Sequence, residues 1–445
     1  MIFAQKDQLI SNGKSTELIQ KREHVLSILS TVLKAVDPYN AVKSRIEDSK
    51  LLLKDQKIDS TQFNNIYVLA FGKGSVGMTQ AACDMLPIKQ ALAITNDPQG
   101  SINHENAEVI IGGHPVPNEQ SIFGAKKAQE LLSFAHNDDL VLILISGGGS
   151  ALLTAPRISL KDLQETTKLL LASGATIQEI NTIRKHVSTV KGGQLIRSLD
   201  CQVMSFIVSD VVGDPFEFIA SGPTVGDSTT FTDAIAILKK YDLWEKVPES
   251  TRKIIEQGKN GILPETPFPH DHLFDNVSNE IIANNSLACE TALLQAKNLG
   301  YKPVLFSNNI TGEAKEIGPQ LIEKARKIKK DGKGNVFIAG GETTVTLQGE
   351  GKGGRNQELV LSVVEMIEDT TELCCSFGTD GIDGMSPAAG AIADGNSKKR
   401  AITQNMAIDT YLKNNDSYTF FNNLNDTIIT GPTGTNVMDI QIIML

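Results

Sequence analysis

The stretch Leu140-Val141-Leu142-Ile143-Leu144-Ile145 runs directly into Ser146-Gly147-Gly148-Gly149-Ser150. An unbroken aliphatic run of this length is typical of a strand buried on both faces, as at the centre of a parallel sheet. The residues from Ala151 onward can begin a helix, so the segment predicts a strand, a glycine turn and a helix. Such a turn exposes N–H groups at the positive end of a helix, which favours a phosphate or carboxylate. The alternative is a tight turn needed only for close packing.

Short apolar runs that end in glycine, serine or aspartate extend this pattern in both directions. They alternate with helical periodicity, which predicts a mostly parallel sheet with helices on both faces. Residues 17–55 are helix-like, and further helices are expected at 121–135 and 160–171. Strands are expected at 66–71, 91–95, 108–111 and 203–208, and in a second series at 280–283, 302–306, 334–339, 343–348, 372–377 and 436–444.

The length of 445 residues exceeds what one hydrophobic core supports, so two domains are expected. Residues 246–279 are rich in proline and polar residues and are interpreted as a linker. The predicted fold is α/β, with a Rossmann-like N-terminal domain at 1–245 whose sheet is mostly parallel. A C-terminal α/β domain with a mixed sheet follows at 280–445, and the first helix is a candidate to pack on that second domain.

Composition narrows the class of protein. The 42 basic and 52 acidic residues give a net charge of −10, which argues against nucleic acid or an anionic membrane as the main partner. The five cysteines are scattered and form no C-x-x-C pair, which favours a reducing compartment. No apolar run approaches the length of a membrane span or of a secretion signal. We therefore expect a cytoplasmic enzyme and count a homodimer among its candidate assemblies.

A second glycine loop follows the expected strand at 66–71. The segment Gly72-Lys73-Gly74-Ser75-Val76-Gly77 matches G-x-G-x-x-G, and Asp97 follows the next strand, as in dinucleotide-binding proteins. This pattern alone indicates NAD, whereas Lys73 would equally suit a transferring phosphoryl group.

A third glycine cluster, Gly349 to Gly354, precedes Arg355 and Asn356 in the second half of the chain. Arg355 could bind phosphate oxygens or a substrate carboxylate through its fork of donors. The alternative is a flexible hairpin that carries a surface arginine.

Two aspartates, Asp210 and Asp380, end apolar runs, where carboxylates of α/β sheets face the ligand crevice and can hold magnesium. Turn chemistry explains such aspartates equally well, and it is the favoured interpretation for Asp383 and Asp394. The basic stretch Arg184-Lys185-His186, with Lys191 nearby, is either a solvated helix face or an anion-binding surface. A structural role is favoured for His114 in its proline-rich loop.

These segments, in order, resemble the glycerate 2-kinase family, whose C-terminal half is called the MOFRL domain. The matching stretches include Phe71-Gly72-Lys73-Gly74, Gly113-His114-Pro115-Val116-Pro117, Ser146–Leu152, Arg184-Lys185-His186, Lys191-Gly192-Gly193, Ile219–Thr224, Gly340–Val345, Gly353–Glu358, Gly378–Gly384 and Gly431–Asn436. Each motif is weak alone, but the ordered set spans the chain from about residue 25 to its end and is highly specific.

The resemblance implies ATP-dependent phosphorylation of D-glycerate to 2-phosphoglycerate, with a divalent cation, in a cleft between two α/β domains. It implies functional roles for Lys73 and Arg355, which we expect on the transferring phosphate. Mg²⁺ is expected on Asp210 and Asp380. The residues expected to bind phosphate or substrate are Gly72, Gly74, Ser146, Gly147, Gly148, Gly149, Ser150, Lys191, Gly353, Gly354 and Asn356.

Two other functions stay open at this point. Some relatives are labelled hydroxypyruvate reductases, which makes an NAD(P)H-dependent reductase the main alternative. A sugar-acid sensor without catalytic activity is motivated only by the anion-binding loops.

Overall fold

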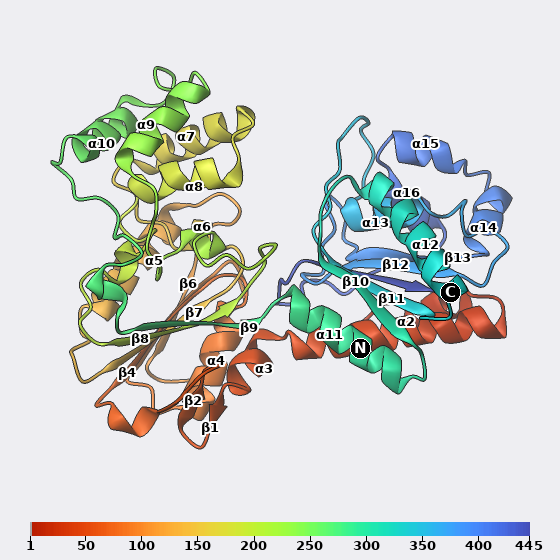
Figure 1. The fold of residues 1–445 in the computed structure, drawn as a ribbon, viewed down its shortest axis with the longest axis horizontal. Helices are drawn as coiled ribbons and strands as arrows, with labels where there is room; N and C mark the ends of the chain where they lie inside the picture. The colour runs from red at the N-terminus through yellow and green to blue at the C-terminus, as the bar shows by residue number, and fades with distance from the viewer. Residues whose placement is uncertain (1) are drawn as a thin grey trace. The chain divides into compact units, whose positions relative to one another are not determined.

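The computed structural model describes residues 2–445 and divides the chain into two compact units (Figure 1). The N-terminal unit is Pro38–Ile282, and the C-terminal unit combines the residues up to Asp37 with Ala283–Leu445. These boundaries differ from the predicted ones at 245 and 280. The helices before Pro38 lie in the C-terminal unit, which is the placement that the sequence left open for the first helix.

The N-terminal unit contains, within residues 2–445, a six-stranded sheet of order β6-β5-β4-β7-β8-β9. The pairs β4/β5, β5/β6, β4/β7 and β7/β8 are parallel. The strands are β4 (Ile66–Phe71), β5 (Gln90–Thr95), β6 (Ala107–Ile111), β7 (Leu140–Ile145), β8 (Gln202–Val208) and β9 (Val277–Ala283). The chain builds β4 to β6 in one direction and then returns to add β7 to β9 on the other side, which is the doubly wound order 3-2-1-4-5-6.

Helices cover both faces of this sheet (Figure 1). Leu69 and Phe71 of β4 share one core with Ala125 and Ala128 of α5 (Glu119–Leu132), while α4 (Ser75–Met85) also packs on β4 and β5. A second core joins a helical cluster, whose members are α7 (Leu160–Ala172), α8 (Ile177–His186), α9 (Phe231–Lys240) and α10 (Glu249–Lys259). A small antiparallel sheet precedes β4 and consists of β1 (Ile46–Glu47), β2 (Lys50–Leu52) and β3 (Lys57–Asp59).

The predicted linker at 246–279 is wrong in part, because this stretch belongs to the N-terminal unit. Its helix α10 buries Ile255 in the helical cluster, and the Oγ1 atoms of Thr251 and Thr166 lie 2.9 Å apart. The strand expected at 280–283 is the end of β9, which completes the first sheet instead of opening the second. The prolines do occupy irregular segments, but these segments flank a packed helix.

The C-terminal unit contains, among the described residues, a mixed sheet of order β10-β11-β15-β12-β13-β14. Its strands are β10 (Pro303–Ile310), β11 (Val336–Gly341), β12 (Leu373–Gly378), β13 (Gly390–Asp394), β14 (Thr427–Ile428) and β15 (Asp439–Met444). Only β10/β11 is parallel among the pairs in this sheet, since β15 inserts antiparallel between β11 and β12. The mixed sheet agrees with the prediction, although β13 and β14 were not expected.

The strand expected at 343–348 does not form. In this segment Thr344 makes only an isolated bridge with Glu313, and the chain continues as an irregular loop toward Arg355. The run Thr343-Thr344-Val345-Thr346 has strand-like side chains, but β15 already occupies the edge of β11 that an added strand would pair with.

Helices cover both faces of the mixed sheet. On one side α2 (Thr16–Ala35) packs with α11 (Asn285–Asn298), and on the other α12 (Ala314–Lys330) packs with α13 (Arg355–Leu361) (Figure 1). The remaining helices of the unit are α1 (Lys6–Ser11), α14 (Ser397–Thr403), α15 (Ile408–Lys413) and α16 (Ser417–Asn423).

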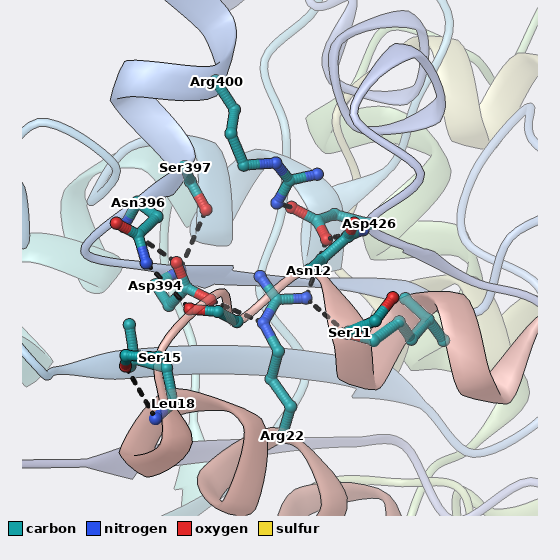
Figure 2. A network of polar contacts seen from close by, with 12 residues as sticks. Ser11, Asn12, Ser15, Leu18, Arg22, Asp394, Asn396, Ser397, Arg400 and Asp426 are labelled. Carbon is teal, nitrogen blue, oxygen red and sulfur yellow. Dashed lines mark hydrogen bonds and ion pairs between the residues drawn. The ribbon is translucent and has the colours of Figure 1, made fainter.

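A buried ion network ties α2 to the C-terminal strands (Figure 2). Arg22 is 0% exposed, and it pairs with Asp394 at 2.5 Å and with Asp426 at 2.7 Å. Asp426 also accepts hydrogen bonds from Asn12 at 2.9 Å and Arg400 at 2.8 Å. This network explains why the N-terminal segment belongs to the C-terminal unit.

Within the described chain, no helix combines the length and the apolar character that crossing a bilayer would require.

Candidate active site

The first two glycine loops leave the sheet at its topological switch point. Strands β4 and β7 are parallel neighbours, with Phe71 paired to Ile145, so both end at the same level. The loop Gly72–Gly74 leads from β4 into α4, and Ser146–Gly148 leads from β7 into the short helix α6 (Gly149–Leu152). In open α/β sheets this is the edge where ligands bind.

Hydrogen bonds join these two loops into one structure. The main-chain N–H of Lys73 donates to the carbonyl of Gly147 at 2.8 Å, and the N–H of Gly74 donates to Ser146 Oγ at 2.9 Å. Gly72 has a φ of 122°, and a Cβ there would collide with Ser146. Glycine is therefore required at Gly72 for the close approach of the loops, in addition to any contact with a ligand.

The side chains of Lys73 and His114 lie beside Gly148. A Cβ at Gly148 would come within 2.9 Å of the His114 ring and 3.5 Å of Lys73 Cγ. Gly148 also has a φ of 84°, a left-handed conformation that glycine adopts without strain. The structure thus brings Lys73 and His114 to the Ser146–Ser150 loop.

Two cations hold the end of the same loop. Lys191 donates to the carbonyls of Ser150 at 2.7 Å and Leu153 at 3.2 Å, and Arg184 donates to Ser150 at 3.2 Å. Neither cation forms an ion pair with a carboxylate among residues 2–445. Lys191 is only 4% exposed, and burial together with the nearby Arg184 holds its pKa well below the usual range. A buried cation without a carboxylate partner is costly to keep charged, and an incoming anion would lower that cost.

The basic stretch around Arg184 is not a solvated helix face. Lys185 is buried and pairs with Asp227 at 3.3 Å, and the His186 ring is also buried. Sequence analysis could not separate these roles, because three adjacent basic residues on a helix point in different directions.

A strained segment supports the loop from the other side. Ala220 and Ser221 have φ values of 51° and 63°, which are uncommon for residues other than glycine. Ser221 Oγ lies 2.8 Å from Ser150 Oγ and 3.1 Å from Asn181 Oδ1. No sequence signal marked Ser221 or Asn181 as individual residues, although Ser221 lies inside the matching segment Ile219–Thr224.

Asp210 lies just past the carboxyl end of β8, next to the strand that carries the Ser146–Ser150 loop. Its half-buried side chain follows the fully buried Ser209. Within the N-terminal unit it is therefore at the ligand-binding edge of the sheet, as expected.

In the C-terminal unit, Arg355 begins α13 and is held by carboxylates. It binds both carboxylate oxygens of Asp439, at 2.5 and 2.9 Å, and also pairs with Glu342 at 3.1 Å. Burial disfavours its charge, but Asp439 and Glu342 outweigh that effect and raise the pKa of Arg355 above its usual value. In the sheet, Asp439 pairs with Gly341 of β11 and with Gly378 of β12. Arg355 is therefore fixed where β11 and β12 end and β15 begins.

The glycines before Arg355 allow a close packing of loops. Asp383 accepts hydrogen bonds from the main-chain N–H groups of Asn356 at 3.0 Å and Gln357 at 2.9 Å, and so caps α13. A Cβ at Gly354 would collide with Asp383, and a Cβ at Gly353 would collide with Ser417. Burial, opposed by these hydrogen bonds, raises the pKa of Asp383 to about 6.

Asn356 is buried, and its side chain bonds Ser376 at 2.5 Å and Asp383 at 3.3 Å. These bonds hold Asn356 in the loop before α13, and the ligand contact expected of it from the sequence stays a prediction. Asp383 and Asp394 have structural roles. Asp383 caps α13, while Asp394 accepts the N–H of Asn396 at 2.8 Å, the turn interaction favoured from the sequence, and also pairs with Arg22.

Asp380 follows β12 and is half-buried, with its carboxylate accepting the N–H of Ile382 at 3.1 Å. That bond is the turn interaction that the sequence left open for this residue. In residues 2–445, no group of three or more histidine, cysteine, aspartate or glutamate side chains is arranged to hold a metal ion.

Comparison with known proteins identifies the family. A family model described as a domain of unknown function (DUF4147) matches residues 24–256, and the MOFRL family model matches residues 335–439. The glycerate 2-kinase of Pyrococcus horikoshii is 44% identical over 95% of this chain and 96% of its own. This chain belongs to the MOFRL-domain glycerate kinase family.

Other members of the glycerate kinase family support the assignment. The D-glycerate 2-kinase of Thermotoga maritima is 37% identical, covering 94% of this chain and 96% of its own. A crystal structure of glycerate kinase from Thermotoga maritima matches with a TM-score of 0.85 at 36% identity, over 95% of this chain and 99% of that one. The two α/β sheets described above are thus the fold of a glycerate kinase family member.

Proposed function

We propose that this chain transfers the γ-phosphoryl group of ATP to the 2-hydroxyl of D-glycerate and forms 2-phosphoglycerate. The observation that supports this most is the 44% identity to a glycerate 2-kinase over 95% of the chain. The two hydrogen-bonded glycine loops beside Lys73 provide a physical reason, because a protein catalyses phosphoryl transfer mainly by positioning the reactants and stabilising their charge.

The proposed roles follow from the chemistry of each group. The Gly72–Gly74 and Ser146–Ser150 loops bind phosphate or substrate oxygens, while the N–H groups of Gly72 and Gly74 bond Ile94 and Ser146 and keep the two loops in place. Lys73 offsets the charge that develops on the transferring group. Arg355 acts as a second charge stabiliser, already oriented by Asp439. Lys191, with its carbonyl partners only, supports the anion at the far end of the Ser146–Ser150 loop, and Gly353 and Gly354 shape the loop at Arg355.

Asp210 and Asp380 suit Mg²⁺ by donor chemistry, since both offer half-buried carboxylates at strand ends. Mg²⁺ commonly uses one or two carboxylates and completes its shell with phosphates and water, so no larger cluster is needed. Bound magnesium would supply charge neutralisation on the phosphates. A cytoplasmic location and a homodimer stay predictions from the sequence.

Two assays test the proposed reaction. The first supplies D-glycerate, ATP and MgCl₂ and follows ADP release, with the position of the phosphate read by ³¹P NMR. The second supplies hydroxypyruvate and NADH, because one relative from Agrobacterium vitis carries a provisional hydroxypyruvate reductase name. ADP and 2-phosphoglycerate without NADH oxidation are expected. NADH oxidation without ADP release would replace the kinase by the reductase.

Substitutions then test the proposed residues. Lys73→Met and Arg355→Met should each lower kcat by on the order of 10²-fold, as loss of a preorganised charge stabiliser does. Arg355→Lys is the matched control that keeps a cation beside Asp439. Asp210→Asn and Asp380→Asn should lower activity with little change in thermal stability, and chelator should abolish turnover until magnesium is restored. Normal specific activity in either asparagine variant would assign that aspartate to turn structure.

A further inference from the structure

A cavity of about 700 Å³ lies beside the Ser146–Ser150 loop, inside the N-terminal unit. Its walls come from α7, α8, the Pro115–Pro117 loop next to His114, and residues 154–156 after α6. Most of the wall is apolar, with Leu163, Ile180 and Val187 at its base. This volume is in the range of sites for a nucleotide-sized molecule, and it exceeds what a three-carbon acid fills.

The charged side chains that line this cavity are all basic. Lys168, Arg184 and Lys191 are among its lining residues, and the lining contains no aspartate or glutamate. Arg184 and Lys191 also contact the carbonyl of Ser150, so they lie between the cavity and the glycine loop. An occupant with an apolar body and an anionic end would therefore place its anion toward the loop.

The mouth of the cavity carries apolar side chains that the protein leaves uncovered. Val116 is 59% exposed, Leu171 is 65% exposed and Ile177 is 53% exposed, and all three line the cavity. Clustered exposed apolar groups around a pocket are typical of a ligand-binding site. Glycerate has no apolar body to cover them, whereas the flat purine of a nucleotide does.

We propose that this cavity receives the purine base of the nucleotide, so that its phosphates extend past Arg184 and Lys191 to the Ser146–Ser150 loop. The proposal rests on the proposed kinase function and refines it, because it assigns ATP to the N-terminal unit. Apart from the three cations, the polar side chains that line the cavity are Thr154, Gln164, Thr167 and Ser188. Base selectivity should accordingly be weak, with GTP accepted within about tenfold of ATP.

The test fills the mouth of the cavity without disturbing the fold. Ala172→Trp changes an exposed lining residue of α7, and Glu165→Trp, at an exposed position of α7 outside the lining, is its matched control. ADP, pyrophosphate and octanoate are titrated calorimetrically into each protein. Ala172→Trp should weaken ADP by at least about tenfold and leave pyrophosphate within about twofold, while Glu165→Trp changes neither.

Two lysine substitutions on α7 provide a second test of the proposal. Lys168 and Lys161 are both exposed lysines of α7, but only Lys168 lines the cavity. Lys168→Glu should raise the KM for ATP severalfold and leave the KM for glycerate unchanged, and Lys161→Glu should change neither.

Unchanged ADP affinity in Ala172→Trp would overturn the proposal, and so would an effect on glycerate alone. Loss of octanoate binding with normal ADP binding would instead assign the cavity to an amphipathic carboxylate. Failure of the kinase function is distinguishable, because wild-type protein that binds ADP through the cavity but forms no phosphoglycerate would contradict the reaction and keep the site.

Discussion

Arg22 in the C-terminal unit and Lys191 in the N-terminal unit are both buried cations, but they differ in their partners. Arg22 is 0% exposed and contacts two buried carboxylates, Asp394 and Asp426 (Figure 2). Lys191 is 4% exposed, and its ammonium donates to the carbonyls of Ser150 and Leu153. Burial disfavours the charge on both, but Asp426 and Asp394 raise the pKa of Arg22, whereas burial and Arg184 lower the pKa of Lys191.

The difference separates structural from functional charge. Arg22 has its counter-charges inside the protein, so its role is to hold α2 on the mixed sheet. The charge on Lys191 lacks a carboxylate partner in the described chain, and it lies beside the glycine loop that we propose binds phosphate. A buried cation of this second kind gains most from an anion supplied from outside.

The largest expected effect is the loss of stability in Arg22→Met. This change leaves the buried Asp394 without its cation and Asp426 with Arg400 alone, and breaking a buried pair typically costs about 3 to 5 kcal/mol. Urea unfolding followed by circular dichroism measures it. Arg400→Met is the control, because Arg400 also pairs with Asp426 but keeps 16% of its side chain exposed, and it should cost clearly less. If Arg22→Met costs under about 1 kcal/mol, the network does not anchor α2.

Lys191→Met should show the opposite pattern. Its stability should change by no more than about 1 kcal/mol, since the loss of two hydrogen bonds is offset by removing an uncompensated buried charge. Its kcat/KM should fall by on the order of 10²-fold, because the phosphate that binds at the Ser146–Ser150 loop no longer interacts with the buried positive charge of Lys191. Steady-state kinetics and urea unfolding on the same preparation test both parts. A variant that unfolds readily but keeps wild-type kcat/KM would make Lys191 a structural residue like Arg22.

The smallest expected effect is a pH dependence of ADP binding. The ammonium form of Lys191 attracts phosphate and the neutral amine does not, so ADP affinity should fall as the pH rises through the lowered pKa of Lys191. Lys191→Arg keeps its charge over this range and should show a flatter profile. Calorimetry at a series of pH values gives the ratio of the two affinities, in which the titration of ADP itself cancels. A constant ratio would contradict the lowered pKa as a factor in binding.

The sequence predicted the parts of the protein that local patterns govern. The strands Ile66–Phe71 and Leu140–Ile145 have the bounds expected from their apolar runs, because a buried central strand must be apolar along its whole length. The glycine loops that follow them were also predicted as turns after strands, and the structure adds that they are hydrogen-bonded to each other. The ordered motifs also indicated the family that the comparisons show.

Tertiary structure decided what depends on residues far apart in the chain. Arg22 lies 372 residues from Asp394, and no local signal in α2 reveals that partner. The same holds for Asn356, whose amide is turned inward by Ser376 and Asp383, and for α10, which is buried by helices that precede it. Local sequence sets which backbone conformation each segment prefers, whereas burial and charge compensation arise only when distant segments meet. Burial and charge compensation therefore determine whether a given lysine or arginine stabilises the fold or keeps a positive charge that a ligand can bind.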